Sequence, residues 1–207
     1  MAPPQTRRPP MQFPINLNLN GRACLLIGGG PIATRKAAQL LACGADLTVI
    51  APEITDELRS RPVTIIERRY AAGDLEGFRL VVTATADPVV DQQIFEEAER
   101  LGIWVNSADD PARCSFTLPA VIRRGDVMVT ASTGGISPAL STWLRQQLGE
   151  VITPEFELIA AELSAERARI HATGASTEDT DWRPIITAIA ARHGIEGFAV
   201  RTGAVAS

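Results

Sequence analysis

The stretch ACLLIGGGPIA at residues 23–33 decides the fold of this chain. A short apolar run that stops at three glycines is typical of a buried strand entering a tight turn. Pro31 suits the first turn of a helix, because its missing N–H would have no intrahelical partner there. Apolar residues then recur at helical spacing from Ala33 to Leu41. The stretch therefore predicts a strand, a glycine turn and a helix that begins near Pro31.

The spacing Gly28-x-Gly30-x-x-Ala33 fits the fingerprint of dinucleotide-binding turns, which permits Ala at its last position. Gly28 would allow the turn, Gly30 would let the backbone approach a pyrophosphate, and Ala33 would keep the helix close to its strand. Free N–H groups and the positive end of the helix dipole would then face the phosphates. The alternative is an ordinary strand-to-helix turn.

A carboxylate follows the next predicted strand, Leu47–Ile50. Glu53 lies about 20 residues beyond the glycines, where an acid that binds the ribose is expected. Its carboxylate would accept hydrogen bonds from ribose hydroxyls and repel a 2′-phosphate, so the sequence favours NAD over NADP. Arg35 and Lys36 weaken this preference slightly, and the alternative is that Glu53 is a solvated loop residue.

Strands and helices alternate along the first half of the chain. Further strands are predicted at residues 63–66, 80–85 and 103–105, helices at 55–58 and 87–101, and an edge strand or extended arm at 13–19. This alternation predicts an α/β fold with a doubly wound parallel sheet, a Rossmann domain. Ligands bind beyond the carboxyl ends of such strands. The loops at residues 28–33, 83–87 and 106–111 are therefore expected to share one crevice.

The pattern changes after residue 114. Two β-prone runs, at residues 115–122 and 127–132, surround a turn at 123–126 and predict an antiparallel hairpin. A single hairpin is marginally stable, so it needs a partner, which could be the same hairpin of a second subunit. Helices are predicted at 139–148, 154–170 and 182–193. The predicted organisation is a disordered tail at 1–12, the Rossmann domain at 13–114, a dimerisation region at 115–150 and a helical region at 151–207.

Composition excludes several classes of function. The formal net charge of −4 argues against a general nucleic-acid binder. Three widely spaced cysteines and two histidines predict neither a disulfide framework nor a metal site, and they favour a reducing cytoplasm. No stretch approaches the roughly 20 apolar residues of a membrane span, so a soluble protein without a membrane partner is expected.

Several side chains could carry chemistry. Asp109 and Asp110 lie at the mouth of the predicted crevice, where one carboxylate could act as a general base while the other caps a turn before Pro111. Asp110 is the better turn former, which leaves Asp109 as the freer acid. Three arginines could bind the carboxylates of an acidic substrate: Arg113, Arg123 and Arg124. For Arg123 and Arg124, at the tip of the predicted hairpin, a solvated charge pair is the commoner role. The loop at 133–135 could hold anions or could simply connect two elements.

Four motifs occur in order along the chain: GGGPIATRKA at 28–37, NSADDP at 106–111, CSFTLPA at 114–120 and STGGISP at 132–138. With them the chain resembles the precorrin-2 dehydrogenase family, the siroheme-synthase unit that in some members doubles as sirohydrochlorin ferrochelatase. The resemblance covers residues 13–150.

The resemblance implies NAD-dependent oxidation of precorrin-2 to sirohydrochlorin by an intertwined homodimer. It implies dinucleotide contacts at Pro31, Ile32, Pro52 and Glu53, and it places the family's catalytic aspartate on Asp109. A serine that is modified in some members falls on Thr133, which makes the same regulation doubtful. We also expect cofactor contacts at Thr85 and Asn106, and substrate contacts at Arg113, Ser115, Thr133 and Gly134.

Two further alternatives stay open at this point. The chain could also insert Fe²⁺ into sirohydrochlorin; without a metal site of its own, the macrocycle would receive the ion while Asp109 accepts pyrrole protons. It could instead be a non-catalytic Rossmann module that senses NAD as a regulatory dimer.

Overall fold

The computed structural model describes residues 11–108 and 110–195. The chain forms two compact units, which divide between Leu118 and Pro119. Residues 1–10 of the predicted tail at 1–12, the candidate acid Asp109 and residues 196–207 lie outside the described residues.

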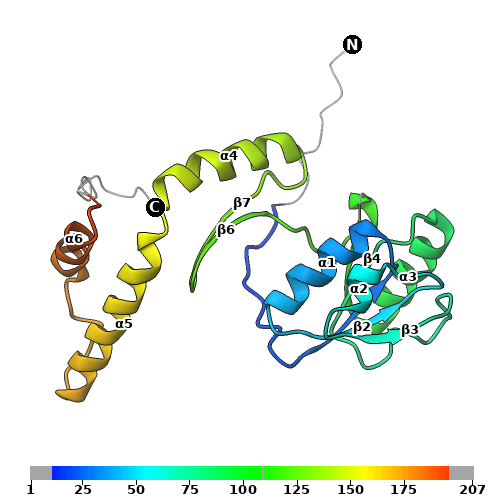
Figure 1. Ribbon diagram of the computed structural model, residues 1–207, viewed down its shortest axis with the longest axis horizontal. Helices are drawn as coiled ribbons and strands as arrows, with labels where there is room; N and C mark the ends of the chain where they lie inside the picture. The colour runs from blue at the N-terminus through cyan, green and yellow to red at the C-terminus, as the bar shows by residue number, and fades with distance from the viewer. Residues whose placement is uncertain (1–10, 109, 196–207) are drawn as a thin grey trace, which may run out of the picture. The chain divides into compact units, whose positions relative to one another are not determined.

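A five-stranded sheet forms the centre of the first unit (Figure 1). The strands lie in the order β3-β2-β1-β4-β5 and every neighbouring pair is parallel. This is the predicted doubly wound topology, in which the chain reverses its direction of winding beside β1. The strands are β1 (Ala23–Ile27), β2 (Asp46–Ile50), β3 (Thr64–Ile66), β4 (Leu80–Thr83) and β5 (Trp104–Ser107).

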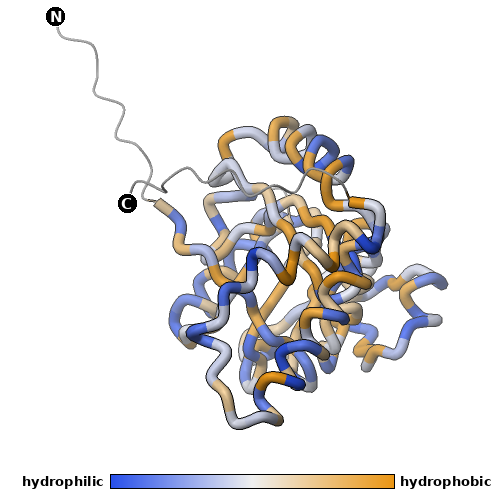
Figure 2. Tube along the Cα trace, turned by 90° about the vertical axis from the view of Figure 1, so that its left-hand side faces the viewer, coloured by the Kyte–Doolittle hydropathy of each residue, from blue (hydrophilic) through white to orange (hydrophobic). Residues whose placement is uncertain are grey.

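Helices cover both faces of this sheet because side chains of a strand alternate between its faces. Leu26 of β1 packs in a cluster with Ala37 of α1, whereas Leu25 packs in a second cluster with Ala98 of α3. All four side chains are fully buried. Figure 2 colours the trace by hydropathy and shows that apolar and polar stretches alternate along it. The helices of this unit are α1 (Pro31–Ala42), α2 (Asp56–Arg59), α3 (Pro88–Leu101) and the short 3-10 helix η1 (Pro111–Arg113).

Residues 13–19, predicted as an edge strand or an extended arm, form no strand in the described part of the chain. Phe13 is 86% exposed. The edge-strand alternative is therefore wrong, because an alternating pattern can form a strand only where a neighbouring backbone offers hydrogen bonds.

The second unit contains the predicted hairpin, with β6 (Ala120–Arg124) antiparallel to β7 (Val127–Ala131). Its loop is only two residues long and begins with Gly125, whose φ of 53° suits the first position of such a loop. Arg123 and Arg124 therefore belong to β6 and not to the tip. The prediction that the strand begins at residue 115 is also wrong: Ser115 donates its N–H to the Val105 carbonyl (2.9 Å) at the free edge of β5.

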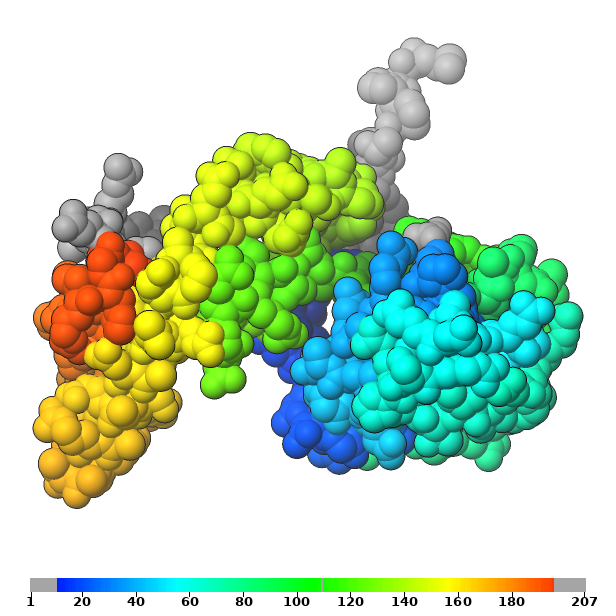
Figure 3. Space-filling model, in the orientation of Figure 1, coloured from blue at the N-terminus to red at the C-terminus, as the bar shows by residue number. Residues whose placement is uncertain are grey.

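Three helices complete the second unit: α4 (Pro138–Val151), α5 (Glu155–Ala172) and α6 (Trp182–Arg192). Helix α4 lies directly on the hairpin, as the space-filling view also shows (Figure 3). Ile159 of α5 and Ile189 of α6 bury a separate small core. None of the helices in the described ranges is both long and apolar enough to cross a membrane.

Candidate active site

The glycine turn after β1 packs against the backbone on two sides. A Cβ on Gly28 would lie 2.3 Å from the Ala84 carbonyl oxygen, and a Cβ on Gly29 would lie 2.0 Å from that of Glu53. Gly28 also has a φ of 125°, which residues with a Cβ rarely adopt. At Gly30, by contrast, an added Cβ would meet nothing within 4 Å. The turn is therefore closed at its first two glycines and open at the third.

Helix α1 begins at this open position. Gly30 is its N-cap residue and has no side chain to cap the helix, and Pro31 takes the first helical position. Ile32 is partly exposed while Ala33 is buried against the sheet. The first-turn N–H groups of an α-helix lack intrahelical acceptors and carry partial positive charge. The start of α1 thus offers uncapped N–H groups beside an open backbone surface, which is an arrangement that suits a phosphate.

The loop after β2 is tied to the same turn. Thr55 donates its N–H to the Gly29 carbonyl (3.0 Å), and its hydroxyl lies 2.9 Å from that of Thr34 in α1. Thr55 also caps α2, as predicted, by accepting from Leu58 N–H (3.3 Å). Glu53 is exposed at the carboxyl end of β2, where a ribose would lie in this fold. Sequence reasoning missed Thr34, whose buried hydroxyl links the two loops.

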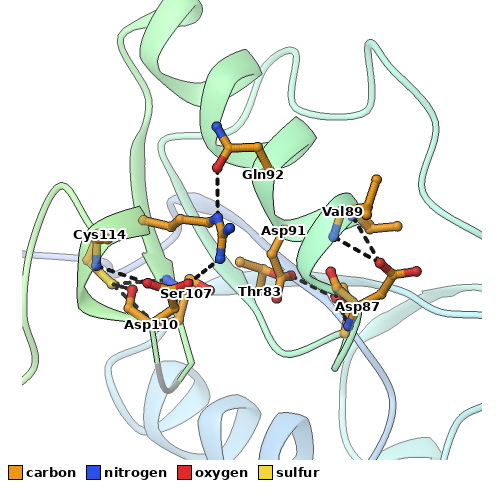
Figure 4. A network of polar contacts seen from close by, with 12 residues as sticks. Thr83, Asp87, Val89, Asp91, Gln92, Ser107, Asp110 and Cys114 are labelled. Carbon is orange, nitrogen blue, oxygen red and sulfur yellow. Dashed lines mark hydrogen bonds and ion pairs between the residues drawn. The ribbon is translucent and has the colours of Figure 1, made fainter.

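The end of β4 and the loop after it are hydrogen-bonded to a buried carboxylate, that of Asp91 in the first turn of α3 (Figure 4). The hydroxyls of Thr83 and Thr85 both donate to Oδ1 of Asp91, the second at 2.8 Å. Asp87 caps α3, as its position before Pro88 predicts, by accepting from Val89 N–H (3.0 Å). Between them Ala86 has a φ of 59°, a left-handed conformation that costs about 1–2 kcal/mol for a residue with a side chain. This loop is therefore held in a strained shape by its hydrogen bonds.

The loop after β5 contains the predicted acidic pair. Asp110 caps η1 by accepting from Ala112 N–H (3.0 Å), which confirms its predicted role before Pro111. It also pairs with Arg113, whose Nε donates to Gln92 Oε1 of α3 (2.8 Å). Asp109 lies outside the described residues. The carboxylate of Asp110 is thus occupied by structural contacts.

Asn106 and Ser107 are buried at the end of β5. The Asn106 amide donates to the Phe116 carbonyl (3.0 Å) and to Cys114 Sγ (3.4 Å). The Ser107 hydroxyl has no hydrogen-bond partner among the described residues. Burial raises the pKa of the Cys114 thiol, and the hydrogen bond that its sulfur accepts from the Ser107 N–H (3.3 Å) opposes that rise.

The remaining substrate candidates have clear structural contacts. Ser115 accepts a hydrogen bond from Val105 N–H (2.8 Å) through its hydroxyl. In the second unit, Thr133 accepts from Ser137 N–H (3.1 Å) at the start of α4, beside the exposed Gly134. Arg124 donates to the Ile152 carbonyl (3.0 Å) at the end of α4. The described residues contain no group of three His, Cys, Asp or Glu side chains that could hold a metal ion.

Residues 15–120 match the family model described as putative NAD(P)-binding, which covers just over half of the chain. The relatives of this chain include the siroheme synthase of Tolumonas auensis, 44% identical over 156 residues that make up 74% of this chain and 33% of the relative. The chain belongs to the precorrin-2 dehydrogenase and siroheme synthase family.

Two further similarities support this membership. The siroheme synthase of Nitrosococcus oceani is 33% identical over 183 residues, or 85% of this chain and 39% of the relative. The solved structure of SirC, a precorrin-2 dehydrogenase, matches with a TM-score of 0.70 and 26% identity, covering 86% of this chain and 89% of that one. The chain spans about a third of the length of the curated relatives that it matches.

Family and geometry agree on a nicotinamide dinucleotide as the ligand of the first unit. The open surface at Gly30 is where a Cβ would fill the space that a pyrophosphate needs. The neighbouring turn of α1 supplies uncapped N–H groups to the same place. The residues present therefore fit the cofactor that the family model names.

Proposed function

We propose that this chain is an NAD-dependent precorrin-2 dehydrogenase, which oxidises precorrin-2 to sirohydrochlorin. The observation that carries the proposal is the open backbone surface at Gly30 and the start of α1, which we call the cradle. It occurs in a chain that matches a precorrin-2 dehydrogenase over 86% of its length. The reaction removes two hydrogens from the substrate, one as a hydride and one as a proton. Bound NAD⁺ would take the hydride, so the chain's own residues must orient both molecules and accept the proton.

The choice of NAD rests on Glu53. Its side chain is exposed at the carboxyl end of β2, and the contacts of Thr55 with the glycine turn hold this loop against the cradle. A carboxylate accepts hydrogen bonds from both ribose hydroxyls, whereas it repels the added charge of a 2′-phosphate. We therefore assign Glu53, with Pro52 beside it, to the adenosine ribose of NAD.

Proton removal is assigned to Asp109. Its neighbour Asp110 already caps η1 and pairs with Arg113, so that carboxylate has little capacity left for chemistry. A general base has to reach the proton directly, and a carboxylate next to the nicotinamide end of the crevice would do so. The structural engagement of Asp110 thus supports Asp109 as the catalytic residue.

The substrate carries several carboxylates, for which guanidinium groups are suitable partners. Arg113 uses its Nε for Gln92 and one terminal nitrogen for Asp110, which leaves further N–H donors on the same group. We propose that these donors and the neighbouring Ser115 bind carboxylates of the tetrapyrrole. Thr133 and Gly134 of the second unit are proposed as substrate contacts in their own right. A cytoplasmic homodimer completes the proposal, and Fe²⁺ insertion into the product is a second activity to be tested beside it.

The test is turnover by the purified chain. Incubation with precorrin-2 and NAD should produce the sirohydrochlorin absorption spectrum together with NADH. Asp109→Asn should slow product formation by about 10²–10⁴ while leaving NADH binding intact, and Asp110→Asn serves as the matched control. Full NADH binding without turnover of precorrin-2 would overturn the proposal and support a cofactor sensor instead. Adding Fe²⁺ to the product tests the second activity separately.

A further inference from the structure

The carboxylate of Asp91 lies inside the first unit, at the start of the helix that follows the loop after β4. Its side chain belongs to the first turn of α3 and is only 8% exposed. Oδ1 accepts two hydrogen bonds, one from the hydroxyl of Thr85 and one from that of Thr83, which Figure 4 shows beside Asp91. Burying a carboxylate is costly unless it is hydrogen-bonded, so this placement needs both donors.

The two donors belong to different parts of the structure. Thr83 is the last residue of β4 and is completely buried, so it fixes Asp91 to the rigid sheet. Thr85 lies in the loop beyond the strand, and its hydroxyl also accepts from Asp87 N–H (3.0 Å). Ala86, which lies between Thr85 and Asp87, has a left-handed φ of 59°. Asp91 therefore connects the loop to the sheet at the point where the backbone is strained.

This loop borders the cradle. Ala84 donates its N–H to the Ile27 carbonyl (2.8 Å), and its own carbonyl is the group that a Cβ on Gly28 would strike. The loop after β4 and the glycine turn are thus in direct backbone contact, on the side of β1 where the winding reverses. Any shift of residues 84–87 would change the shape of the cradle.

We infer that Asp91 is a positioning residue for the cofactor: by accepting from Thr83 and Thr85 it fixes the loop at 84–87 in the shape that the dinucleotide requires. This inference rests on the proposed function only for the identity of the ligand. The next residue, Gln92, accepts from Arg113 in the loop after β5. The first turn of α3 therefore bonds both to the loop after β4 and to the loop after β5.

The experiment measures NADH binding by the purified full chain, using NADH fluorescence, in a double-mutant cycle. Asp91→Leu keeps the size of the side chain but removes the acceptor, and it should raise the Kd for NADH about tenfold. Thr85→Val should raise the Kd to a similar extent. Because both variants remove the same Asp91–Thr85 hydrogen bond, the double variant should bind NADH no worse than the weaker-binding single variant. Asp91→Asn retains Oδ1 as an acceptor and should restore binding to within about threefold of the unchanged chain.

Ile94→Val controls for a loss of stability, since it removes one buried methylene from α3 without touching the loop. It should lower the Tm and leave the Kd unchanged. The inference is overturned if Asp91→Leu binds NADH normally, or if the two single effects multiply in the double variant. Should Asp91→Leu fail to fold, an unchanged Kd for Thr85→Val overturns it equally. Binding without precorrin-2 turnover refutes only the proposed function, whereas a native chain that does not bind NADH refutes both.

Discussion

Replacing Gly30 by Ala should separate cofactor binding from folding. The backbone of Gly30 has a φ of −82° and a ψ of −172°, which any residue adopts, and an added Cβ would meet nothing within 4 Å. Gly→Ala at such a position stabilises the fold by about 0.4–1 kcal/mol through the unfolded chain. At an N-cap, Ala is worse than Gly by about 0.5–1 kcal/mol. The two effects offset one another, so the free energy of unfolding should change by less than about 0.5 kcal/mol.

The same methyl group would occupy the space into which the pyrophosphate fits. Losing one hydrogen bond from the backbone to a charged phosphate costs about 1.5–3 kcal/mol, which corresponds to a Kd for NADH roughly 10- to 150-fold higher. Calorimetric titration with NADH measures the affinity, and urea denaturation measures the stability. Gly29→Ala is the contrasting control, because its Cβ would lie 2.0 Å from the Glu53 carbonyl oxygen. That clash should destabilise the fold by about 1–3 kcal/mol. If Gly30→Ala binds NADH as tightly as the native chain, the cradle has been placed wrongly.

Three further predictions follow from individual charges. Glu53→Gln should lower the ratio of NAD to NADP affinity about tenfold, and an unchanged ratio would remove Glu53 from the ribose site. Asp109→Asn should lower kcat by about 10²–10⁴ with little change in stability. Asp110→Asn keeps an oxygen that can cap η1 but loses the ion pair with Arg113, so it should lower the free energy of unfolding by about 0.2–1 kcal/mol and leave kcat nearly unchanged. The reverse pattern would exchange their roles. Arg68 holds the pKa of Asp74 below its usual value, so this pair stabilises the fold above the unfolded pKa of about 3.9, and the effect is lost as the pH falls through the folded pKa. Urea denaturation at pH 7 and pH 3 should therefore show a smaller loss of stability for Arg68→Ala than for the native chain, and equal losses would contradict the assignment.

Local pattern was sufficient where one stretch of chain supplies all the interacting groups. The strand at Ala23–Ile27, the turn at Gly28 and the helix from Pro31 are contiguous, and each follows from residue types within a few positions. The caps at Thr55 and Asp87 were predictable for the same reason, because the hydroxyl or carboxylate binds N–H groups two or three residues further on.

Prediction failed where the partner comes from elsewhere in the chain. Residues 115–119 are β-prone, yet Ser115 bonds to the edge of β5 and the hairpin strand begins only at Ala120. The alternating residues 13–19 form no strand in the described part of the chain, because a strand needs a neighbouring backbone. Neither outcome depends on the residue types of the segment alone.

The sequence by itself determined the parallel α/β sheet, the glycine turn at its switch point and the position of Glu53 in the loop after the second strand. Hydrophobic period and turn chemistry are local properties of the chain. Only the tertiary structure decided which polar groups are already engaged, such as Asp91 with Thr83 and Thr85, or Arg113 with Gln92. The physical reason is that a hydrogen bond requires two groups within about 3 Å. Where the two groups are far apart in the chain, the register of the strands and the docking of the helices set that distance.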